Sequence, residues 1–372
     1  MHQNCMEFDQ KKWNLERYPK TKNRSLRAWS AVDEFILSEI KKFEWESKQV
    51  SIYHDSHGAL TCALNKCQPL SVIHLKSQLK ATKKNFELNK IPLENLRWDN
   101  PLKMNNPIDI GLLKIPKSIA LFDFYLKSIH QYSKNDATIL CGFMTRNFTP
   151  NMVSLAEHYF DNVSQTKAKK KARILILKQP KKDINNQLSF HEIKNDLGLT
   201  IKQYPGVFSD KKIDYGTRLL LESIPKINDH DTILDLACGN GIIAAYMRVQ
   251  NTKCNIHLVD DSFLAISSAK LNLSKENTYF HWKNDLNIKI KTDKKFNLIT
   301  CNPPFHFEFE NTIEIALNLF KNAKKHLTNN GTLLIVANRH LNYTTHLVKL
   351  FDSVKTIKSN DKYEVISCSI LP

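Results

Sequence analysis

The chain has 372 residues, of which 42% are hydrophobic, and this suggests about two domains that can each bury a core. It begins without the apolar segment of a signal peptide and contains no run long enough to span a bilayer, so we expect a cytoplasmic protein. The eight cysteines form no C-x-x-C pair or other zinc-like spacing, so we expect no metal site.

The formal net charge of +17 favours a polyanionic partner, because a strong positive field attracts nucleic acid. The alternative explanation of this charge is a lysine-rich composition that an AT-rich genome encodes, without any polyanionic partner. A membrane surface is disfavoured, because no stretch has the pattern of a basic amphipathic anchor.

Two segments of the first half recur in the second half, in the same order. Residues 33–40 resemble residues 217–224, and residues 159–163 resemble residues 350–354. In each half the second segment leads through a lysine-bearing stretch to an apolar strand, which in the first half is predicted at residues 172–177. Together these matches predict a duplicated domain.

A basic cluster lies just before the predicted domain boundary. Lys and Arg neutralise phosphate charge, so these side chains are candidates for RNA contact, with a solvated surface turn as the equal alternative. The cluster consists of Lys167, Lys169, Lys170, Lys171 and Arg173. The polar stretch at residues 178–195 contains a proline at 180 and predicts a division into domains 1–185 and 186–372.

Strands and helices alternate along the second half. Short apolar runs predict strands, and longer amphipathic runs between them predict helices. The strands are predicted at 232–236, 257–260, 278–282, 296–301 and 332–337, and the helices at 242–250, 262–272 and 312–327, with a turn at 329–331. This alternation indicates an α/β fold with a parallel sheet covered by helices on both faces.

A glycine-bearing turn links the first strand and first helix of this half. Gly239 and Gly241 let the backbone turn tightly and approach a ligand. Asp260 ends the next strand, about 20 residues on, where a carboxylate can bind ribose hydroxyls. The pattern Gly239-x-Gly241-x-x-Ala244 also fits a nicotinamide dinucleotide site. Asp235 argues against that reading, since it would repel a pyrophosphate and can instead meet a cationic ligand.

Asn302-Pro303-Pro304-Phe305, at the end of the fourth predicted strand, is the most specific feature. An exocyclic amino nitrogen of a base is a poor nucleophile, because its lone pair is delocalised into the ring. The Asn302 side-chain oxygen and the Pro303 carbonyl can each accept one of its N–H bonds and orient that lone pair. Phe305 can stack on a base turned out of its helix. The alternative is a proline-rich strand end without a catalytic role.

These two motifs resemble those of class I methyltransferases. Residues 235–241 are similar to the D-x-G-x-G-x-G loop, although Ala237 replaces its first glycine, a small change that we expect to be tolerated. Residues 302–305 are similar to the N-P-P-F/Y motif of methyltransferases that act on planar amino nitrogens. The resemblance implies S-adenosylmethionine as the cofactor, with Asp235 near its cationic methionine end.

With His306 added, the run resembles that of the bacterial ribosomal RNA guanine-N2 methyltransferases. Residues 206–209 and 214–217 are similar to the family's G-V-F-S…D-x-G-T segment, which leads into the cofactor pocket, and residues 284–285 follow the third strand, where such enzymes contact adenine. The cofactor-binding residues implied are Phe208, Asp214, Gly216, Thr217, Asp235, Gly239, Gly241, Asp260, Asn284 and Asp285.

That family pairs a degenerate N-terminal methyltransferase domain with an active C-terminal one. The resemblance thus implies two tandem class I, Rossmann-like domains, which agrees with the duplication. The first half lacks the motifs: residues 53–58 stand where the glycine loop would be, and residues 115–118 stand where Asn302 to Phe305 would be. We interpret it as a non-catalytic domain that binds substrate.

The family has a small-subunit and a large-subunit branch, and residues 28–34, 58–60 and 336–343 resemble the latter. The resemblance therefore implies an enzyme that methylates N2 of a guanine in 23S ribosomal RNA. A monomer is favoured, with the oligomeric state left open. The alternatives are a guanine of 16S ribosomal RNA, adenine-N6 in a nucleic acid, a glutamine side chain in a protein, or a non-enzymatic RNA-binding factor that retains the fold.

Overall fold

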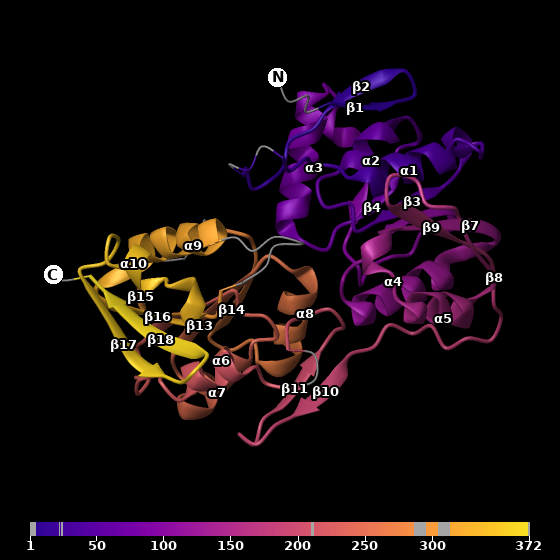
Figure 1. The fold of residues 1–372 in the computed structure, drawn as a ribbon. Coiled ribbons are helices and arrows are strands. Elements are labelled where there is room, and N and C mark those ends of the chain that lie inside the picture. Colours follow the sequence, from indigo (N-terminus) through magenta and orange to yellow (C-terminus); the bar gives the residue numbers. More distant parts are fainter. Residues whose placement is uncertain are drawn as a thin grey trace. The chain divides into compact units, whose positions relative to one another are not determined.

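The computed structural model describes residues 5–21, 23, 25–209, 212–285, 295–303 and 313–370. The chain divides into two compact units, Met1–Ser189 and Phe190–Pro372, which we call the first and the second unit (Figure 1). Each unit contains a two-stranded hairpin and a seven-stranded sheet. None of the helices in the described ranges is long and apolar enough to cross a membrane.

The large sheet of the second unit is parallel except at one edge. Its strand order is β14-β13-β12-β15-β16-β18-β17, and β18 runs antiparallel to both of its neighbours. The elements of this unit are β10 His191–Lys194, β11 Thr200–Gln203, α6 Tyr215–Leu221, β12 Thr232–Leu236, α7 Ile242–Gln250, β13 Asn255–Asp260, α8 Phe263–Asn272, β14 Thr278–Trp282, β15 Phe296–Cys301, α9 Ile313–His326, β16 Leu327–Asn338, η5 Arg339–Leu341, α10 Thr344–Leu347, β17 Ser353–Ser359 and β18 Tyr363–Ser369.

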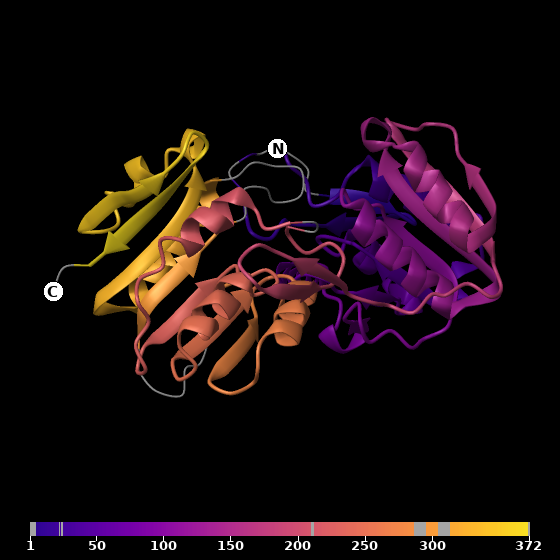
Figure 2. The same cartoon turned by 90° about the horizontal axis from the view of Figure 1, so that it is seen from below.

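Two hydrophobic clusters hold helices on both faces of this sheet. Side chains of α6, α7 and α8 pack with alternate strand residues on one face, and side chains of α9 and α10 pack on the other. The edge strands β17 and β18, yellow in Figure 2, complete the sheet beyond β16. The predicted α/β fold is thus confirmed, because the apolar runs found in the sequence are the strands buried between these layers.

The predicted turn at residues 329–331 lies inside the long strand β16. Leu327 pairs with Phe296, whereas Thr332 pairs with Leu298, so the chain bulges out between these two pairs. A Cβ atom on Gly331 would lie 2.8 Å from the carbonyl oxygen of Phe296, which explains the glycine there. The strand therefore begins earlier than the apolar pattern indicates, because backbone pairing resumes on both sides of the bulge.

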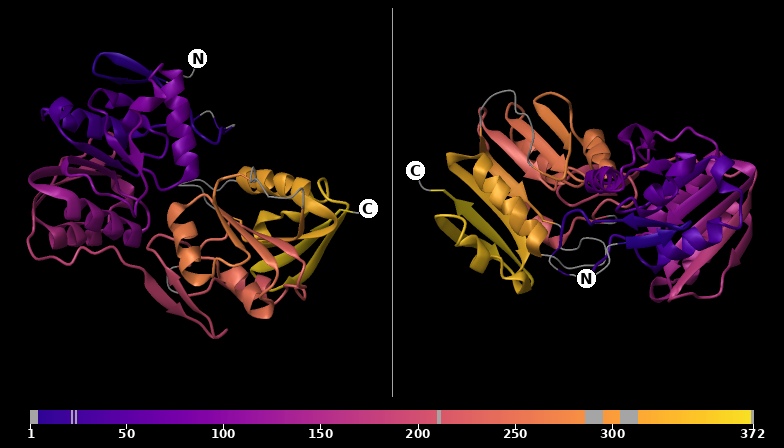
Figure 3. Two further views of the ribbon diagram at one scale, coloured as in Figure 1. Left: turned by 180° about the vertical axis from the view of Figure 1, so that it is seen from behind. Right: turned by 90° about the horizontal axis from the view of Figure 1, so that it is seen from above.

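The first unit repeats this topology strand for strand. Its order is β5-β4-β3-β6-β7-β9-β8, again with an antiparallel pair beyond the fifth strand (Figure 3). Its elements are β1 Cys5–Phe8, β2 Lys11–Asn14, α1 Ala31–Ile40, η1 Trp45–Ser47, β3 Val50–Tyr53, α2 Ala59–Ala63, η2 Asn65–Cys67, β4 Leu70–Val72, α3 Lys76–Leu88, η3 Leu93–Asn95, β5 Trp98–Asp99, β6 Ile108–Lys114, α4 Ile119–Tyr132, β7 Ser133–Met144, η4 Thr145–Asn147, α5 Pro150–Tyr159, β8 Phe160–Gln165 and β9 Ala172–Pro180.

Finer details also recur and confirm the predicted duplication. Strand β7 bulges against β6 as β16 does against β15, since Ile108 pairs with Ser133 and Ile110 with Thr138. Gly58 and Gly241 each precede a helix with a left-handed backbone, at φ 74° and 80°. Such a shared irregularity at matching places is much stronger evidence of duplication than short sequence matches.

These anchors align the two units residue by residue. We count back along the chain from Gly58 and Gly241 and then follow the pairing of neighbouring strands. This matches each polar residue at the edge of the second sheet with a counterpart in the first. In the first unit Ile52 stands for Asp235, Ser56 for Gly239, Ile73 for Asp260 and Lys114 for Asn302. Two carboxylates have thus become isoleucines, and the amide has become a lysine.

Lys114 is part of a buried ion pair. Its Nζ atom lies 3.1 Å from Oδ1 of Asp33, a residue with no exposed surface, and the Ser30 amide donates to the same carboxylate at 2.7 Å. Asp33 begins the α1 segment that matches the α6 segment beginning at Thr217. Where the second unit has Asn302, the first unit therefore has an internal ion pair.

We expect Lys114→Met to lower the free energy of unfolding of the first unit by about 3 kcal/mol or more, because the buried Asp33 charge loses its partner. The matched control is Lys12→Met, which breaks the Lys12–Glu7 pair, whose side chains are 64% and 72% exposed. That control should change stability by less than about 1 kcal/mol. Chemical denaturation measures both, and equal losses would contradict the structural role assigned to Lys114.

Candidate active site

The candidate residues of the second unit converge at one edge of its sheet. Strands β12, β13, β14 and β15 are parallel, so their carboxyl ends meet there, which is where α/β sheets bind ligands. Ile233, Leu258 and Leu298 pack on the face of the sheet covered by α6, α7 and α8. Asp235, Asp260 and Asn302 follow them by two, two and four residues along the same strands. Their side chains therefore lie on one face of the sheet.

Asp260 organises the glycine loop. Its carboxylate accepts a hydrogen bond from the Gly239 amide at 2.9 Å and another from the Ser262 amide at 2.8 Å. A Cβ atom on Gly239 would meet nothing within 4 Å, so the space beside this turn is open, whereas one on Gly241 would lie 3.0 Å from Cβ of Ala269. Gly241 thus allows α7 and α8 to pack, and Gly239 leaves room beside the carboxylate for a ligand.

Ala237 has the backbone of a glycine. Its φ angle is +59°, in the left-handed region, where a residue with a Cβ atom loses about 1–2 kcal/mol relative to the right-handed region. The loop therefore keeps the shape that a glycine would give it, held by the Cys238 amide, which donates to the Val259 carbonyl at 3.1 Å.

Asp235 is fully buried and only half satisfied. Its Oδ1 atom accepts a hydrogen bond from the Thr300 hydroxyl at 3.1 Å. Oδ2 is buried and has no hydrogen bond of normal length to a described residue, although the backbone amide of Ala244 lowers the pKa of this carboxyl. Burial raises the pKa of the Asp235 carboxyl to about 7. Burial also raises the pKa of Asp260 to about 6, although the Ser262 and Gly239 amides oppose this shift. Buried acceptors without partners are rare and mark places where a ligand can supply a donor.

Asn302 is held by its amide nitrogen. Nδ2 donates to the Thr217 hydroxyl at 2.9 Å, and Oδ1 is buried without a hydrogen-bond partner in the described part of the chain. Pro303 is buried beside it. Pro304, Phe305 and His306 lie outside the described residues. The sequence predicts that Asn302 accepts a hydrogen bond from an N–H group, and its Oδ1 atom is available for that bond among the described residues.

The N-terminus of α6 positions Thr217. The Asp214 carboxylate accepts hydrogen bonds from the Gly216 and Thr217 amides at 2.9 and 3.2 Å, and the Tyr363 hydroxyl donates to it at 3.4 Å. The sequence assigned Asp214, Gly216 and Thr217 to the cofactor. In the structure they form the helix cap and the hydroxyl that hold the amide of Asn302, a link that the sequence analysis missed.

The remaining predicted cofactor residues flank this edge. The Lys283 amide donates to the Asp260 carbonyl at 3.0 Å, which brings Asn284 and Asp285 next to that aspartate, and Oδ1 of Asn284 is buried without a partner among the described residues. Phe208 is 57% exposed and follows β11.

Two residues that the sequence did not single out, Gln203 and Asn240, connect the segment that follows β11 to the glycine loop. The Asn240 side chain donates to Gln203 at 2.7 Å, and Gln203 donates to the Val207 carbonyl at 3.2 Å. Both side chains are buried amides, and only the fold reveals that they face each other.

The predicted basic cluster belongs to the first unit, in the turn between β8 and β9. Lys170 pairs with Glu34 of α1 at 2.7 Å, Lys169 donates to the Ser38 hydroxyl at 3.4 Å, and Arg173 donates to Gln165 at 2.8 Å. The cluster is therefore part of the first unit, and these three side chains contact residues of that same unit.

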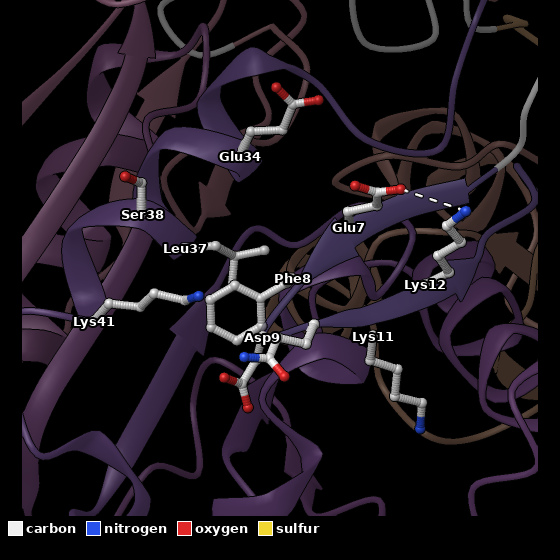
Figure 4. Close-up of a pocket in the computed structure, with 10 residues that line it drawn as sticks. Glu7, Phe8, Asp9, Lys11, Lys12, Glu34, Leu37, Ser38 and Lys41 are labelled. Atoms are coloured by element: carbon white, nitrogen blue, oxygen red, sulfur yellow. Dashed lines mark ion pairs between the residues drawn. The ribbon is translucent and has the colours of Figure 1, made fainter.

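Glu34 and Ser38 also line a pocket of about 450 Å³ between α1 and the β1–β2 hairpin. Figure 4 shows Lys41 directed at the ring of Phe8, with its Nζ atom 4.9 Å from the ring centroid. Glu7 and Lys12 form an ion pair at its rim. Because acidic and basic side chains alternate around this pocket, it has no clear preference for an anion.

Two family models together match nearly the whole chain. Residues 3–182 match the RLMG N-terminal domain, and residues 198–367 match the methyltransferase small domain. Ribosomal RNA large subunit methyltransferase G of Psychromonas ingrahamii is 31% identical over 370 residues, which cover 95% of both chains. The protein of that name from Shewanella oneidensis is 30% identical over 365 residues, covering 95% of this chain and 96% of its own.

A solved structure shares the two-domain fold. The T. thermophilus 16S rRNA N2 G1207 methyltransferase, solved in complex with AdoMet and guanosine, superposes with a TM-score of 0.76 at 16% identity and covers 99% of this chain and 98% of its own. Among the described residues, no three His, Cys, Asp or Glu side chains gather as a metal site would require.

The fold and the edge of polar residues thus define an S-adenosylmethionine-dependent methyltransferase of class I, built from two tandem domains of which the first is degenerate. The relatives that match along almost the entire length narrow this class. The chain belongs to the family of ribosomal RNA large subunit methyltransferase G.

We expect the affinity for S-adenosylmethionine to rise as the pH increases from 5 to 7. Below a pH of about 6 the Asp260 carboxyl is protonated, and its charged form is the better acceptor for ribose hydroxyls. Binding therefore favours the deprotonated state, so the Kd should fall through pH 6, with a further step near 7 from Asp235. Isothermal titration calorimetry over this range measures the Kd.

The control for this titration is Asp260→Asn, which should bind more weakly and lack the step near pH 6 while keeping the one from Asp235. An amino acid's own carboxyl and amino groups titrate near 3.5 and 7.8, roughly, and so change little over most of this window. A Kd of the native protein that stays constant from pH 5 to 7 would show that neither carboxylate contacts the ligand.

Proposed function

We propose that the chain transfers the methyl group of S-adenosylmethionine to the exocyclic N2 of a specific guanine in 23S ribosomal RNA. The observation that carries the reaction is the buried Oδ1 of Asn302, which has no hydrogen-bond partner among the described residues and is held in place through Thr217. The relatives' name supports the large ribosomal subunit as the source of the substrate. The net charge of +17 supports an RNA partner.

The residues present fit the methyl donor. The space beside Gly239 is open, and the carboxylate of Asp260 accepts a hydrogen bond from the Gly239 amide. On the same face of the sheet, an oxygen of Asp235 has no hydrogen bond of normal length to a described residue. Asp260 would bind the ribose hydroxyls, Asn284 and Asp285 the adenine, and Asp235 would face the cationic methionine end. When bound, S-adenosylmethionine supplies an electrophilic methyl group.

Asn302 and Pro303 act on the guanine amino group. Asn302 accepts one N–H bond at Oδ1, and the Pro303 carbonyl accepts the other, so the nitrogen becomes more nearly tetrahedral and its lone pair points away from both acceptors. These acceptors also stabilise the positive charge that develops on the nitrogen. Because Thr217 fixes the amide, Asn302 needs no rearrangement before it acts. Pro304 and Phe305 complete the proposed loop, with Phe305 stacked on the base.

The two units divide the work in this proposal. The second unit is catalytic, whereas the first unit binds RNA without catalysis. Ile52, Ile73 and Lys114 support this division, since they offer no acceptor for ribose, methionine or an amino group. A ribosomal RNA substrate places the reaction in the cytoplasm, and the chain acts as a monomer.

The basic turn between β8 and β9 is the proposed phosphate contact of the first unit. Lys167, Lys169, Lys170, Lys171 and Arg173 carry five positive charges in seven residues, and among the described residues only Glu34 forms an ion pair with one of them. Lys167 and Lys171 are exposed and have no ion-pair partner among the described residues. These two side chains are therefore the ones available to RNA.

Methyl transfer to purified ribosomal RNA tests the proposed reaction. Labelled S-adenosylmethionine is supplied with 23S and 16S RNA from cells that lack the protein, and the product is digested to nucleosides. We expect N2-methylguanosine in 23S RNA alone. Label in 16S RNA alone would contradict the assigned subunit, and N6-methyladenosine would contradict the assigned amino group.

In the same assay Asn302→Ala should lower the methylation rate by at least about 100-fold, as expected for removing an aligned acceptor from a reacting group. Binding of S-adenosylmethionine should stay within about two-fold, because Asn302 contributes no acceptor to the pocket beside Gly239. Asn318→Ala, on the exposed side of α9, is the matched control and should retain full activity. Full activity of Asn302→Ala would refute the mechanism.

Replacing Lys167 and Lys171 together by alanine should weaken RNA binding and make it less sensitive to salt. Each lost phosphate contact lowers the slope of log affinity against log salt by about 0.7–0.9, so the double variant should lose roughly 1.5. The control double variant, Lys83→Ala with Lys103→Ala, removes two exposed lysines elsewhere in the first unit. An equal change in both variants would mean that net charge matters and the turn does not.

A further inference from the structure

Asn338 is a polar residue that the proposed reaction leaves without a role. It ends β16, the strand next to β15, and its Oδ1 atom is buried without a hydrogen-bond partner among the described residues. Leu334 and Val336, two and four residues earlier, pack on the same face as Leu298. By strand alternation, Asn338 therefore shares its face of the sheet with Asn302.

The register places the two asparagines close together. Cys301 pairs with Ile335, so Asn302 lies level with Val336, and Asn338 extends two residues further toward the carboxyl edge. Adjacent strands are about 4.8 Å apart and each residue advances about 3.3 Å, which puts the two Cα atoms roughly 8 Å apart. Side chains at that separation can contact one planar ligand together.

The duplicated unit supports a role at the site. The counterpart of Asn338 in the first unit is Met144, because Cys141 pairs with Leu113 as Ile335 pairs with Cys301. Asn338 therefore follows the same pattern as Asp235, Asp260 and Asn302, each of which has lost its function as an acceptor in the non-catalytic unit. A merely structural amide gives no reason for this pattern.

The arrangement of the site fixes the side from which a base arrives. The carboxylates of Asp235 and Asp260 lie on β12 and β13, to one side of Asn302, and β16 lies on its other side. If the methyl donor is bound over β12 and β13, the base must reach Asn302 from the opposite direction, over the end of β16. Its ring then lies beside Asn338.

We propose that Asn338 determines specificity for guanine, an inference that rests on the proposed function. The guanine edge presents O6, N1–H and the N2 amino group in that order. Asn302 accepts from N2, so the neighbouring amide meets the other two groups: Asn338 Oδ1 accepts from N1–H, and its Nδ2 donates to O6. Adenine has no N2 amino group for Asn302, and it presents an acceptor at N1 and an amino group at C6, so the Asn338 amide would have to turn over to pair with it.

The test compares guanine with 2-aminopurine at the methylated position of an RNA transcript, once that position is located. 2-Aminopurine keeps the exocyclic amino group but lacks N1–H and O6. Native protein should prefer guanine in kcat/KM by roughly 5- to 150-fold, the range of a bidentate amide contact to a base. Asn338→Ala should lower kcat/KM for guanine by that factor and leave 2-aminopurine within about two-fold, so that the preference disappears.

Two further variants make the result decisive. Asn338→Leu, of similar size but without hydrogen-bonding groups, should abolish the preference as well and serves if the alanine variant does not fold. Asn330→Ala, an exposed asparagine at the other end of the same strand, should behave as the native protein does. An equal loss on both bases, or a preference unchanged in both Asn338 variants, would overturn the inference.

Failure of the proposed function gives a different result. If the native protein forms no N2-methylguanosine in ribosomal RNA, the proposed reaction falls before any base is replaced. If it forms N2-methylguanosine and the Asn338 variants keep the guanine preference, the reaction stands and only the role of Asn338 is wrong.

Discussion

The hydrogen bond from the Asn302 amide to the Thr217 hydroxyl is the interaction on which the site depends. An asparagine side chain offers a donor and an acceptor group, and occupying the donor fixes which way the acceptor points. The cap of α6 therefore matters for chemistry although it is built of ordinary helix-capping contacts. Through them, the position of a helix end controls the direction of one oxygen atom at the end of β15.

Duplication shows what happens to the same edge when chemistry is not required. In the first unit a lysine replaces the asparagine and pairs with a buried aspartate, so the polar groups satisfy each other internally. In the second unit Asp235, Asn302 and Asn338 each keep a buried oxygen without a hydrogen bond of normal length to any described residue. Leaving such groups unpaired costs stability, and this cost is expected where a ligand completes the hydrogen bonds. In the first unit, therefore, the polar groups at this edge bond to each other, whereas in the second unit they need a ligand to complete their hydrogen bonds.

Much of the fold follows from local sequence pattern. The strands at 232–236 and 296–301 have the bounds that their apolar runs predict, because buried parallel strands need apolar side chains on both faces. The strand at 278–282 also has its predicted bounds, although it lies at the edge of the sheet. The bulge at residues 329–331 could not be predicted, since it depends on which residues of β15 the strand pairs with. The sequence also indicated the duplication, but its residue-level alignment required the shared left-handed glycines.

Some residues of the candidate site can also be predicted from the sequence, whereas others become apparent only in the structure. Motifs identify Asp260 and Asn302, because their chemistry requires particular residue types next to glycine or proline. They do not identify Asn338, which is preceded only by apolar residues and resembles any polar residue that ends a strand. Its significance comes from two facts that exist only in three dimensions: its face of the sheet matches that of Asn302, and its strand lies on the side away from the two carboxylates. In this proposal, a residue that selects the base therefore leaves a weaker pattern in the sequence than the motif that activates it. A single amide at the right place on a strand can form hydrogen bonds with two groups of a guanine.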